Sequence, residues 1–176
     1  MPTIIRSTRT CPNTPCVLFA LEEVGQPYER AVVEDGWFIE RFGVPGPALE
    51  EAGLVVVELG AVLRHIARAY GGGMLLPAGL SGLAEMDRWL DFLLRRIGRA
   101  LDNPAELGRL FGVLDRQLDG RDFVVGEFSI VDCLYAWMTA PALRGRIPLA
   151  SAPRVAGYLD RLAARPAIAR AFAATT

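Results

Sequence analysis

The chain of 176 residues contains no lysine, and all nineteen of its basic residues are arginine. This absence excludes a Schiff-base lysine, a P-loop lysine and a lysine general base. Histidine is nearly absent too, because His65 is the only one. A metal site built from several histidines is therefore excluded, and a histidine-centred catalytic triad could use only His65. We predict no metal.

The chain also has little net charge and no long apolar run. The net charge of -1 at pH 7 argues against a nucleic-acid partner, which requires a surplus of basic residues. No apolar stretch approaches the length of a membrane span, and residues 1–9 lack the apolar core of a signal peptide. We therefore expect a cytoplasmic protein with no membrane partner. Its cysteines, an odd number in a reducing compartment, are expected to be free thiols: Cys11, Cys16 and Cys133.

The first part of the chain alternates between short β-branched runs and amphipathic stretches, which is typical of an α/β layer with a mixed sheet. The last two strands flank a Glu-Ala-Gly turn, which suits an antiparallel hairpin. We predict a helix after the first strand, a short helical or irregular segment over residues 35–42, and a helix over residues 60–70. The predicted strands cover residues 3–5, 28–33, 47–50 and 54–57.

The start of the first helix bears on function, because Cys11 lies there. Proline is favoured at the first helical position, where its missing N–H costs nothing, so Cys11 followed by Pro12 fits a helix entry. Asn13 or Thr14 is the alternative cap. At a helix entry, the positive end of the helix and nearby Arg9 would favour the thiolate form of Cys11, which is the nucleophile.

The character of the chain changes after three consecutive glycines at residues 71–73. From Ser81 onward, apolar positions keep a helical period and no strand pattern returns convincingly. Ser129 and Asp132 form a Ser-x-x-Asp capping box before another helix. We predict an α/β domain over residues 1–72, a linker over 73–80 and an all-α domain over 81–176.

The stretch from Gly46 to Arg64 combines a strand, a tight turn, a second apolar strand and the start of a helix. It delivers Glu58 and the first N–H groups of that helix to one point, where partial positive charge accumulates. This is the plan of a small-anion site. Glu58 closes this apolar strand, so we expect its carboxylate to be buried, where it is costly without a compensating partner. The alternative is that Glu58 caps the helix that begins near Gly60.

Several segments, in order along the chain, resemble characteristic motifs of the glutathione transferase family. The resemblance covers nearly the whole chain and implies the glutathione transferase fold, a thioredoxin-like α/β N-terminal domain followed by an all-α C-terminal domain. It also implies a homodimer, with glutathione held by the first domain and the co-substrate between the two. The matching segments are residues 20–29, the Gly46-Pro47-Ala48-Leu49 cis-proline motif, Glu58-Leu59-Gly60-Ala61-Val62, residues 126–132 with the buried cap, and residues 153–158 with 165–167.

The resemblance further implies a set of site residues. Cys11 stands where the family places its catalytic Ser, Tyr or Cys, and it is similar to the cysteine-type members, whose thiol forms a mixed disulfide with glutathione. The alternative is an inert thiol at a helix cap. Gly46 and Pro47 would present their backbone to glutathione, and Glu58 would pair with its α-amino group. Leu59 replaces a serine whose hydroxyl donates to the γ-glutamyl carboxylate, although the backbone N–H of residue 59 could still donate.

We therefore expect a glutathione transferase-like enzyme with glutathione as co-substrate. It would act on a small electrophile or a mixed disulfide, by thiol transfer or conjugation, or by glutathione-dependent isomerisation. The alternative is a non-catalytic transferase-like module for binding or dimerisation that has lost strong glutathione binding. Leu59 favours that alternative, as does Pro45, which replaces a basic or polar contact to the glycyl carboxylate; Arg41 could supply this contact instead. Cys11 favours the enzyme.

Overall fold

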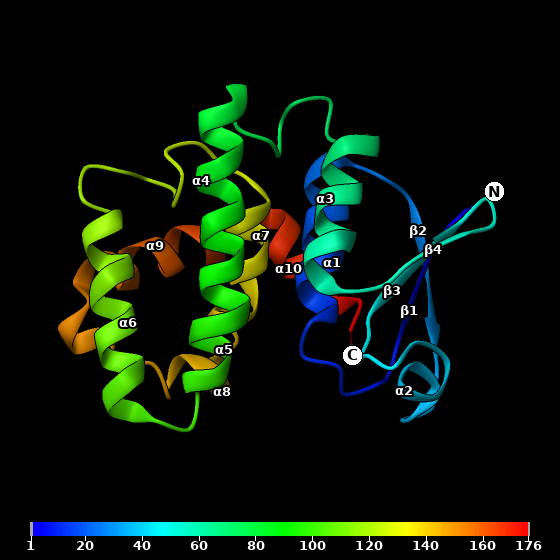
Figure 1. The fold of residues 1–176 in the computed structure, drawn as a ribbon, viewed down its shortest axis with the longest axis horizontal. Helices are drawn as coiled ribbons and strands as arrows, with labels where there is room; N and C mark the ends of the chain where they lie inside the picture. Colours follow the sequence, from blue (N-terminus) through cyan, green and yellow to red (C-terminus); the bar gives the residue numbers. More distant parts are fainter. Residues whose placement is uncertain (1, 176) are drawn as a thin grey trace. The chain divides into compact units, whose positions relative to one another are not determined.

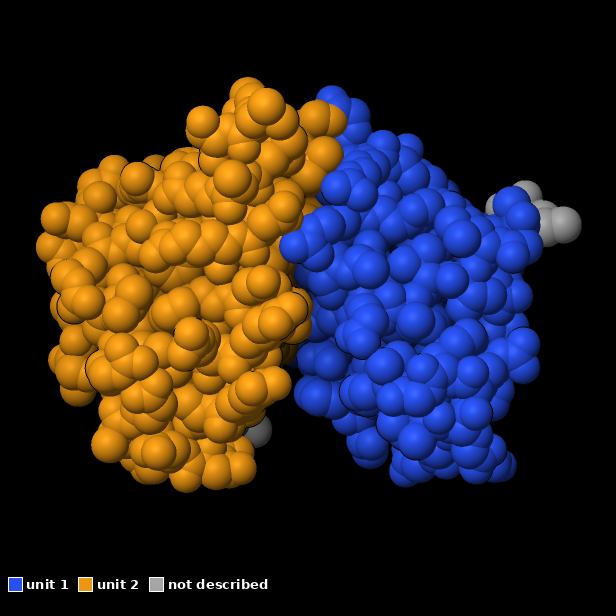
Figure 2. Space-filling model, viewed as in Figure 1, with its two compact units in different colours: residues 1–72, 166–176 blue, residues 73–165 orange. Residues whose placement is uncertain are grey.

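The computed structural model describes residues 2–175, with the side chains of residues 141 and 142 excepted; its helices and strands are labelled in Figure 1. The two end residues of the predicted domains, Met1 and Thr176, lie outside this range. The chain divides into two compact units (Figure 2). Unit 1 consists of residues 1–72 together with 166–176, and unit 2 consists of residues 73–165. The sequence pattern assigns residues 166–176 to the all-α domain, whereas in the structure residues 166–175 belong to unit 1.

Unit 1 contains a mixed sheet of four strands in the order β2-β1-β3-β4. Strand β1 is parallel to β2 and antiparallel to β3, as expected for an α/β layer with a mixed sheet. Strands β3 and β4 form the predicted antiparallel hairpin, and its turn residues Ala52 and Gly53 have φ values of 46° and 84°. Strand β4 therefore lies at an edge of the sheet. The strands are β1 (Thr3–Ser7), β2 (Tyr28–Val32), β3 (Ala48–Glu51) and β4 (Leu54–Val56).

Three helices of unit 1 lie on one side of this sheet: α1 (Thr14–Val24), α3 (Leu59–Tyr70) and α10 (Pro166–Ala173) (Figure 1). A fourth helix, α2 (Trp37–Phe42), connects β2 to β3. Every residue of α1 from Thr14 to Leu21 is buried, because α3 and α10 both pack on this helix. A helix that is apolar on all sides is stable in water only when other elements pack against it. The contact between α1 and α10 explains why the C-terminal segment belongs to unit 1.

Unit 2 is helical, as the sequence predicts. Its first three segments follow one another without a break, where the sequence indicates one long helix from Ser81 onward. Large aromatic side chains fill the core of this unit, among them the fully buried Trp89, Phe111 and Tyr135. Within residues 2–175, no helix combines the length and the apolar character that crossing a membrane requires. The segments are α4 (Gly79–Asp91), the π-helical turn η1 (Phe92–Ile97), α5 (Gly98–Ala100), α6 (Pro104–Gln117), α7 (Ile130–Tyr135), the 3-10 turn η2 (Ala136–Thr139), α8 (Pro141–Arg144), the 3-10 turn η3 (Leu149–Ser151) and α9 (Pro153–Ala163).

A fully buried carboxylate, Asp132, ties the core of unit 2 together. One of its oxygens accepts hydrogen bonds from the N–H and the hydroxyl of Ser129, at 2.8 and 3.2 Å, so the predicted capping box of α7 is confirmed. The other oxygen accepts from the Val124 N–H at 3.3 Å and from the Tyr158 hydroxyl at 2.8 Å. Burial raises the pKa of Asp132 from 3.8 to about 6, and the hydrogen bonds oppose this rise.

The raised pKa of Asp132 predicts a pH-dependent stability. Between pH 3.8 and about 6 the folded state binds more protons at this carboxyl than the unfolded chain does. The stabilising contribution of Asp132 is therefore complete below about pH 4 and falls by about 3 kcal/mol as the pH rises through 6. We expect Asp132→Asn to remove this component. Urea unfolding of both proteins between about pH 4 and 7 measures their free energies of unfolding. If the difference in free energy between wild type and Asp132→Asn does not change with pH, the prediction is contradicted.

Candidate functional site

Cys11 lies in the loop between β1 and α1, ahead of the helix. Helix α1 begins at Thr14, with Asn13 in the N-cap position and Pro15 in the first turn. The prediction that the helix begins at Pro12 is therefore wrong. The alternative N-cap residue, Asn13, does occupy the N-cap position, although its side chain makes no capping hydrogen bond within the described chain. The physical reason is that the Thr14 N–H closes a turn onto the Cys11 carbonyl oxygen at 3.3 Å, and Pro15 takes the early helical position instead.

A hollow of about 350 Å³ opens beside Cys11. The loop after β1, the region where α2 begins and the turn before β3 all contribute to it. The Cys11 thiol donates a hydrogen bond to the Gly46 carbonyl oxygen at 3.4 Å. The fold thus brings together two predicted site residues that lie 35 positions apart in the sequence. The lining residues are Thr8, Thr10, Cys11, Pro12, Asn13, Asp35, Gly36, Phe38, Ile39, Pro45 and Gly46.

Gly46 and Pro47 form a buried turn at this hollow, and the peptide bond between them is cis. Gly46 lies directly against the ring of Phe38, which is only 2% exposed. A Cβ atom at position 46 would approach that ring to 2.4 Å. A larger residue would therefore force the buried ring or the turn to shift, and this favours glycine at position 46. The backbone of Gly46 is consequently the part of this residue that can meet a ligand.

Glu58 and Leu59 lie at the start of α3 and are not among the residues that line the hollow. Glu58 occupies the N-cap position with φ of 70°, but its side chain makes no capping hydrogen bond within the described chain. The Glu58 side chain is exposed, whereas Leu59 is buried at 6% exposure. The expected burial of the Glu58 carboxylate is therefore wrong. Strand β4 is an edge strand whose Leu54 and Val55 are themselves 47% and 39% exposed, so its apolar run did not indicate burial.

Comparison with models of known protein families finds no match, and neither does comparison with curated proteins. Solved structures, by contrast, match nearly the whole chain. Ure2p5 from Phanerochaete chrysosporium, cocrystallised with 1-(S-glutathionyl)-2,4-dinitrobenzene, is similar with a TM-score of 0.87 and 21% identity, over 99% of this chain and 94% of that one. Glutathione S-transferase-I bound with lactoylglutathione has a TM-score of 0.83 and 20% identity, over 100% of both chains. The nitrogen regulation fragment of the yeast prion protein Ure2p has a TM-score of 0.85 and 20% identity, over 97% of this chain and 95% of that one. The chain has the glutathione transferase fold.

This glutathione transferase fold confirms the predicted fold class, a thioredoxin-like α/β unit followed by a helical one. Its hollow beside Cys11 carries little charge: among the lining residues described, Asp35 is the only charged one. Sequence reasoning missed Asp35. The Asp35-Gly36 pair is a turn signal, but nothing local shows that this turn comes to face Cys11.

The arginines expected near the site have other positions in this glutathione transferase fold. Arg41, the candidate contact for the glycyl carboxylate, lies with its guanidinium 5.6 Å from the ring centroid of Trp37. Arg9 lines a neighbouring hollow of about 440 Å³. Neither arginine is among the residues that line the hollow beside Cys11. Among the described residues that line the hollow beside Cys11, none has a cationic side chain that could bind a ligand's carboxylate.

The other thiols and the imidazole of the glutathione transferase fold do not line this hollow. Cys16 and Cys133 are fully buried, whereas Cys11 is half-buried. The ring Nε2 of His65 lies 2.6 Å from a carboxylate oxygen of Glu51, at a distance that fits a hydrogen bond in a polar network away from the hollow's lining. Among residues 2–175, no group of three or more His, Cys, Asp or Glu side chains could hold a metal ion. Cys11 is thus the thiol that lines this hollow.

Proposed function

We propose that the protein is a glutathione transferase-like enzyme that uses Cys11 as its reactive thiol and glutathione as co-substrate. One observation carries this proposal: a half-buried thiol faces a hollow and contacts the buried Gly46 carbonyl. Solved proteins with this fold were crystallised with 1-(S-glutathionyl)-2,4-dinitrobenzene and with lactoylglutathione. These ligands support glutathione chemistry for the present chain as well.

The reaction that we propose is thiol transfer. The Cys11 thiolate attacks the glutathionyl sulfur of a mixed disulfide, the S–S bond breaks, and the released thiolate takes a proton from water. A second glutathione thiolate then attacks the glutathionyl sulfur held on Cys11. This step forms glutathione disulfide and returns the Cys11 thiolate, so glutathione is the reductant and the electrons balance.

Glutathione binding is proposed to use the backbone around the buried turn and the start of α3. The extended peptide would lie along Gly46 and Pro47, in the manner of an added strand. The exposed Glu58 carboxylate, which does not cap the helix, would pair with the α-amino group. The Leu59 N–H, at the positive end of the twelve-residue helix α3, would donate to the γ-glutamyl carboxylate.

Leu59→Ser is expected to bind glutathione at least about tenfold more tightly than Leu59→Ala, because a serine hydroxyl would add a hydrogen bond to a charged group. Both variants lose the same buried leucine side chain, so the comparison cancels the packing loss. Calorimetric titration with glutathione measures the two affinities. Equal affinities would contradict the proposed position of the γ-glutamyl carboxylate.

A second candidate function is a non-catalytic module for binding. The lining of the hollow favours it, because glutathione carries two carboxylates and Asp35 is the only charged lining residue described. The fold is also that of the nitrogen regulation fragment of the yeast prion protein Ure2p. Mass spectrometry of the intact protein after incubation with glutathione disulfide separates the two functions. An adduct on Cys11 supports the enzyme, and no adduct together with no glutathione binding supports the module.

We propose a homodimer as the assembly and the cytoplasm as its location. The exposed Leu54 and Val55 on edge strand β4 support the first, since an edge strand with apolar side chains is a surface that a second copy can cover. Free thiols support the second, because they persist in a reducing compartment. Sedimentation velocity measures the assembly state.

A further inference from the structure

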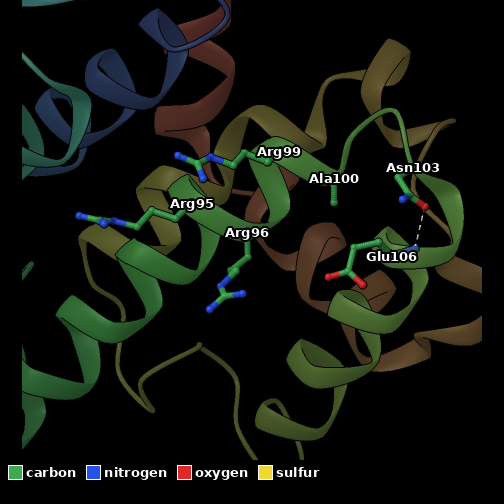
Figure 3. Close-up of a pocket in the computed structure, with 6 residues that line it drawn as sticks. All are labelled: Arg95, Arg96, Arg99, Ala100, Asn103 and Glu106. Atoms are coloured by element: carbon green, nitrogen blue, oxygen red, sulfur yellow. Dashed lines mark hydrogen bonds between the residues drawn. The ribbon is translucent and has the colours of Figure 1, made fainter.

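A second hollow, of about 500 Å³, lies in unit 2, and three arginines are among the residues that line it. The turn η1 and helix α5 supply the arginines, and the start of α6 supplies the opposite wall. Its volume is within the range of small-molecule sites and exceeds what a single inorganic ion would fill. The residues that line it are Arg95, Arg96, Arg99, Ala100, Asn103 and Glu106 (Figure 3).

Two consecutive helical segments supply all three arginines. Arg95 and Arg96 belong to the π-helical turn η1, and Arg99 follows in α5. Residues four apart share a helix face, so Arg95 and Arg99 project together. Figure 3 shows the Arg95 and Arg99 side chains extending in the same direction, the Arg96 side chain extending in a different one, and the Glu106 carboxylate turned toward the arginine side. A π-helical turn within a longer helix is rare and frequently marks a functional site.

Carboxylates neutralise only part of this positive charge. Arg95 lies 3.5 Å from Asp91, at an exposed position where such a pair contributes little. Within residues 2–175, neither Arg96 nor Arg99 has a hydrogen bond or an ion pair. Several other arginines of unit 2, though not all, have carboxylate partners within 4.0 Å, among them Arg144 with Asp160, Arg146 with Asp102, Arg154 with Asp115 and Arg161 with Asp122.

Glu106, the carboxylate inside the hollow, is already engaged. Both of its oxygens accept hydrogen bonds from Arg109, at 2.7 and 2.8 Å. This hydrogen bonding is the largest cause that lowers the pKa of Glu106, and the charge of Arg96 contributes least among the causes. The guanidinium of Arg96 therefore stays available for another anion.

We propose that this hollow binds a small molecule that carries two or more phosphate or carboxylate groups. The planar guanidinium of arginine recognises both kinds of group through paired hydrogen bonds. Arg96 and Arg99 would each hold one anionic group, with Arg95 adding charge beside them. The start of α6, a helix of fourteen residues, adds partial positive charge on the opposite wall. The residues that line this hollow are all different from those that line the hollow beside Cys11.

Calorimetric titration with inorganic pyrophosphate and with tricarballylate, at low ionic strength, tests the proposal and identifies the source of the anionic groups. We expect saturable binding of at least one probe, and binding at least about tenfold weaker in the double variant Arg96→Gln/Arg99→Gln. Preference for pyrophosphate indicates a phosphorylated ligand, and preference for tricarballylate indicates a polycarboxylate. Either preference supports the site.

Two further variants make the test specific to this hollow. Glu106→Gln should tighten binding by about twofold or more, because it removes the one negative charge of the lining. Arg116→Gln, an exposed change on α6 outside the hollow, removes one positive charge from the same unit and should leave the affinity unchanged. No saturable binding, or an equal loss in Arg116→Gln, would overturn the proposal. A changed sedimentation coefficient in the double variant without probe binding would also overturn it, because the arginines would then contact a second copy of this chain.

Discussion

Replacing Cys11 with serine is expected to slow glutathione-dependent thiol transfer by at least about a hundredfold. A hydroxyl cannot form the mixed disulfide on which the proposed reaction depends. The same hydroxyl can still donate to the Gly46 carbonyl oxygen, as the thiol does at 3.4 Å, so the loop keeps its contact. Loss of rate in Cys11→Ser therefore reports the sulfur and not the fold. The assay follows reduction of the mixed disulfide of glutathione and cysteamine.

The matched control for this prediction is Cys16→Ala. Cys16 is fully buried in α1, where a thiol is inert. We expect this variant to keep the rate within about threefold and to keep one glutathione adduct by mass spectrometry. A glutathione adduct that survives in Cys11→Ser, or an unchanged rate in that variant, would remove Cys11 from the mechanism.

Replacing Asp132 with alanine is expected to lower the free energy of unfolding by about 3 to 5 kcal/mol. The change leaves the Val124 N–H, the Ser129 N–H and the Tyr158 hydroxyl without their buried acceptor. Each orphaned donor costs about 1 to 3 kcal/mol. The desolvation that raises the pKa of Asp132 to about 6 offsets part of this sum at neutral pH. The remainder is a large share of the roughly 5 to 15 kcal/mol that holds a typical domain folded.

Urea unfolding of Asp132→Ala and of Asp102→Ala at neutral pH measures this effect against a matched control. Asp102 has a hydrogen-bonding partner too, Arg146 at 2.9 Å, but the Asp102 side chain is 95% exposed. Its removal should therefore cost less than about 1 kcal/mol. If Asp132→Ala does not fold, Asp132→Asn keeps one acceptor oxygen and should give a smaller, measurable loss. A loss below about 1 kcal/mol in Asp132→Ala would show that the buried carboxylate does not organise unit 2.

Features that depend on neighbouring residues could be predicted from the sequence. The Glu-Ala-Gly turn between two apolar runs predicts the β3–β4 hairpin, because turn chemistry and strand alternation act over a few residues. The spacing of Ser129 and Asp132 predicts the capping box of α7 for the same reason. The absence of lysine and the single histidine restricted the candidate chemistry to thiol, hydroxyl, carboxylate and arginine groups.

The start of α1 and the setting of Glu58 depend on more distant parts of the chain. Pro12 and Pro15 both satisfy the local rule for a helix entry, and only the turn that Thr14 closes onto Cys11 selects the second. The apolar run before Glu58 fits a central or an edge strand equally well, and strand order alone places it at the edge. The helix pattern after residue 165 likewise carries no sign that α10 packs against α1 in unit 1.

The sequence by itself determined the fold class, the thiol candidate and the Gly46-Pro47 turn. Tertiary structure alone decided which residues face Cys11, because segments far apart in the chain converge there: Cys11 meets the Gly46 carbonyl, and Asp35 joins the same hollow. It also decided that Arg96 and Arg99 have no carboxylate partner within the described chain. Composition can show that charges nearly balance over the whole chain, but which charges pair depends on distances of a few ångströms between helices. Those distances exist only in the folded protein.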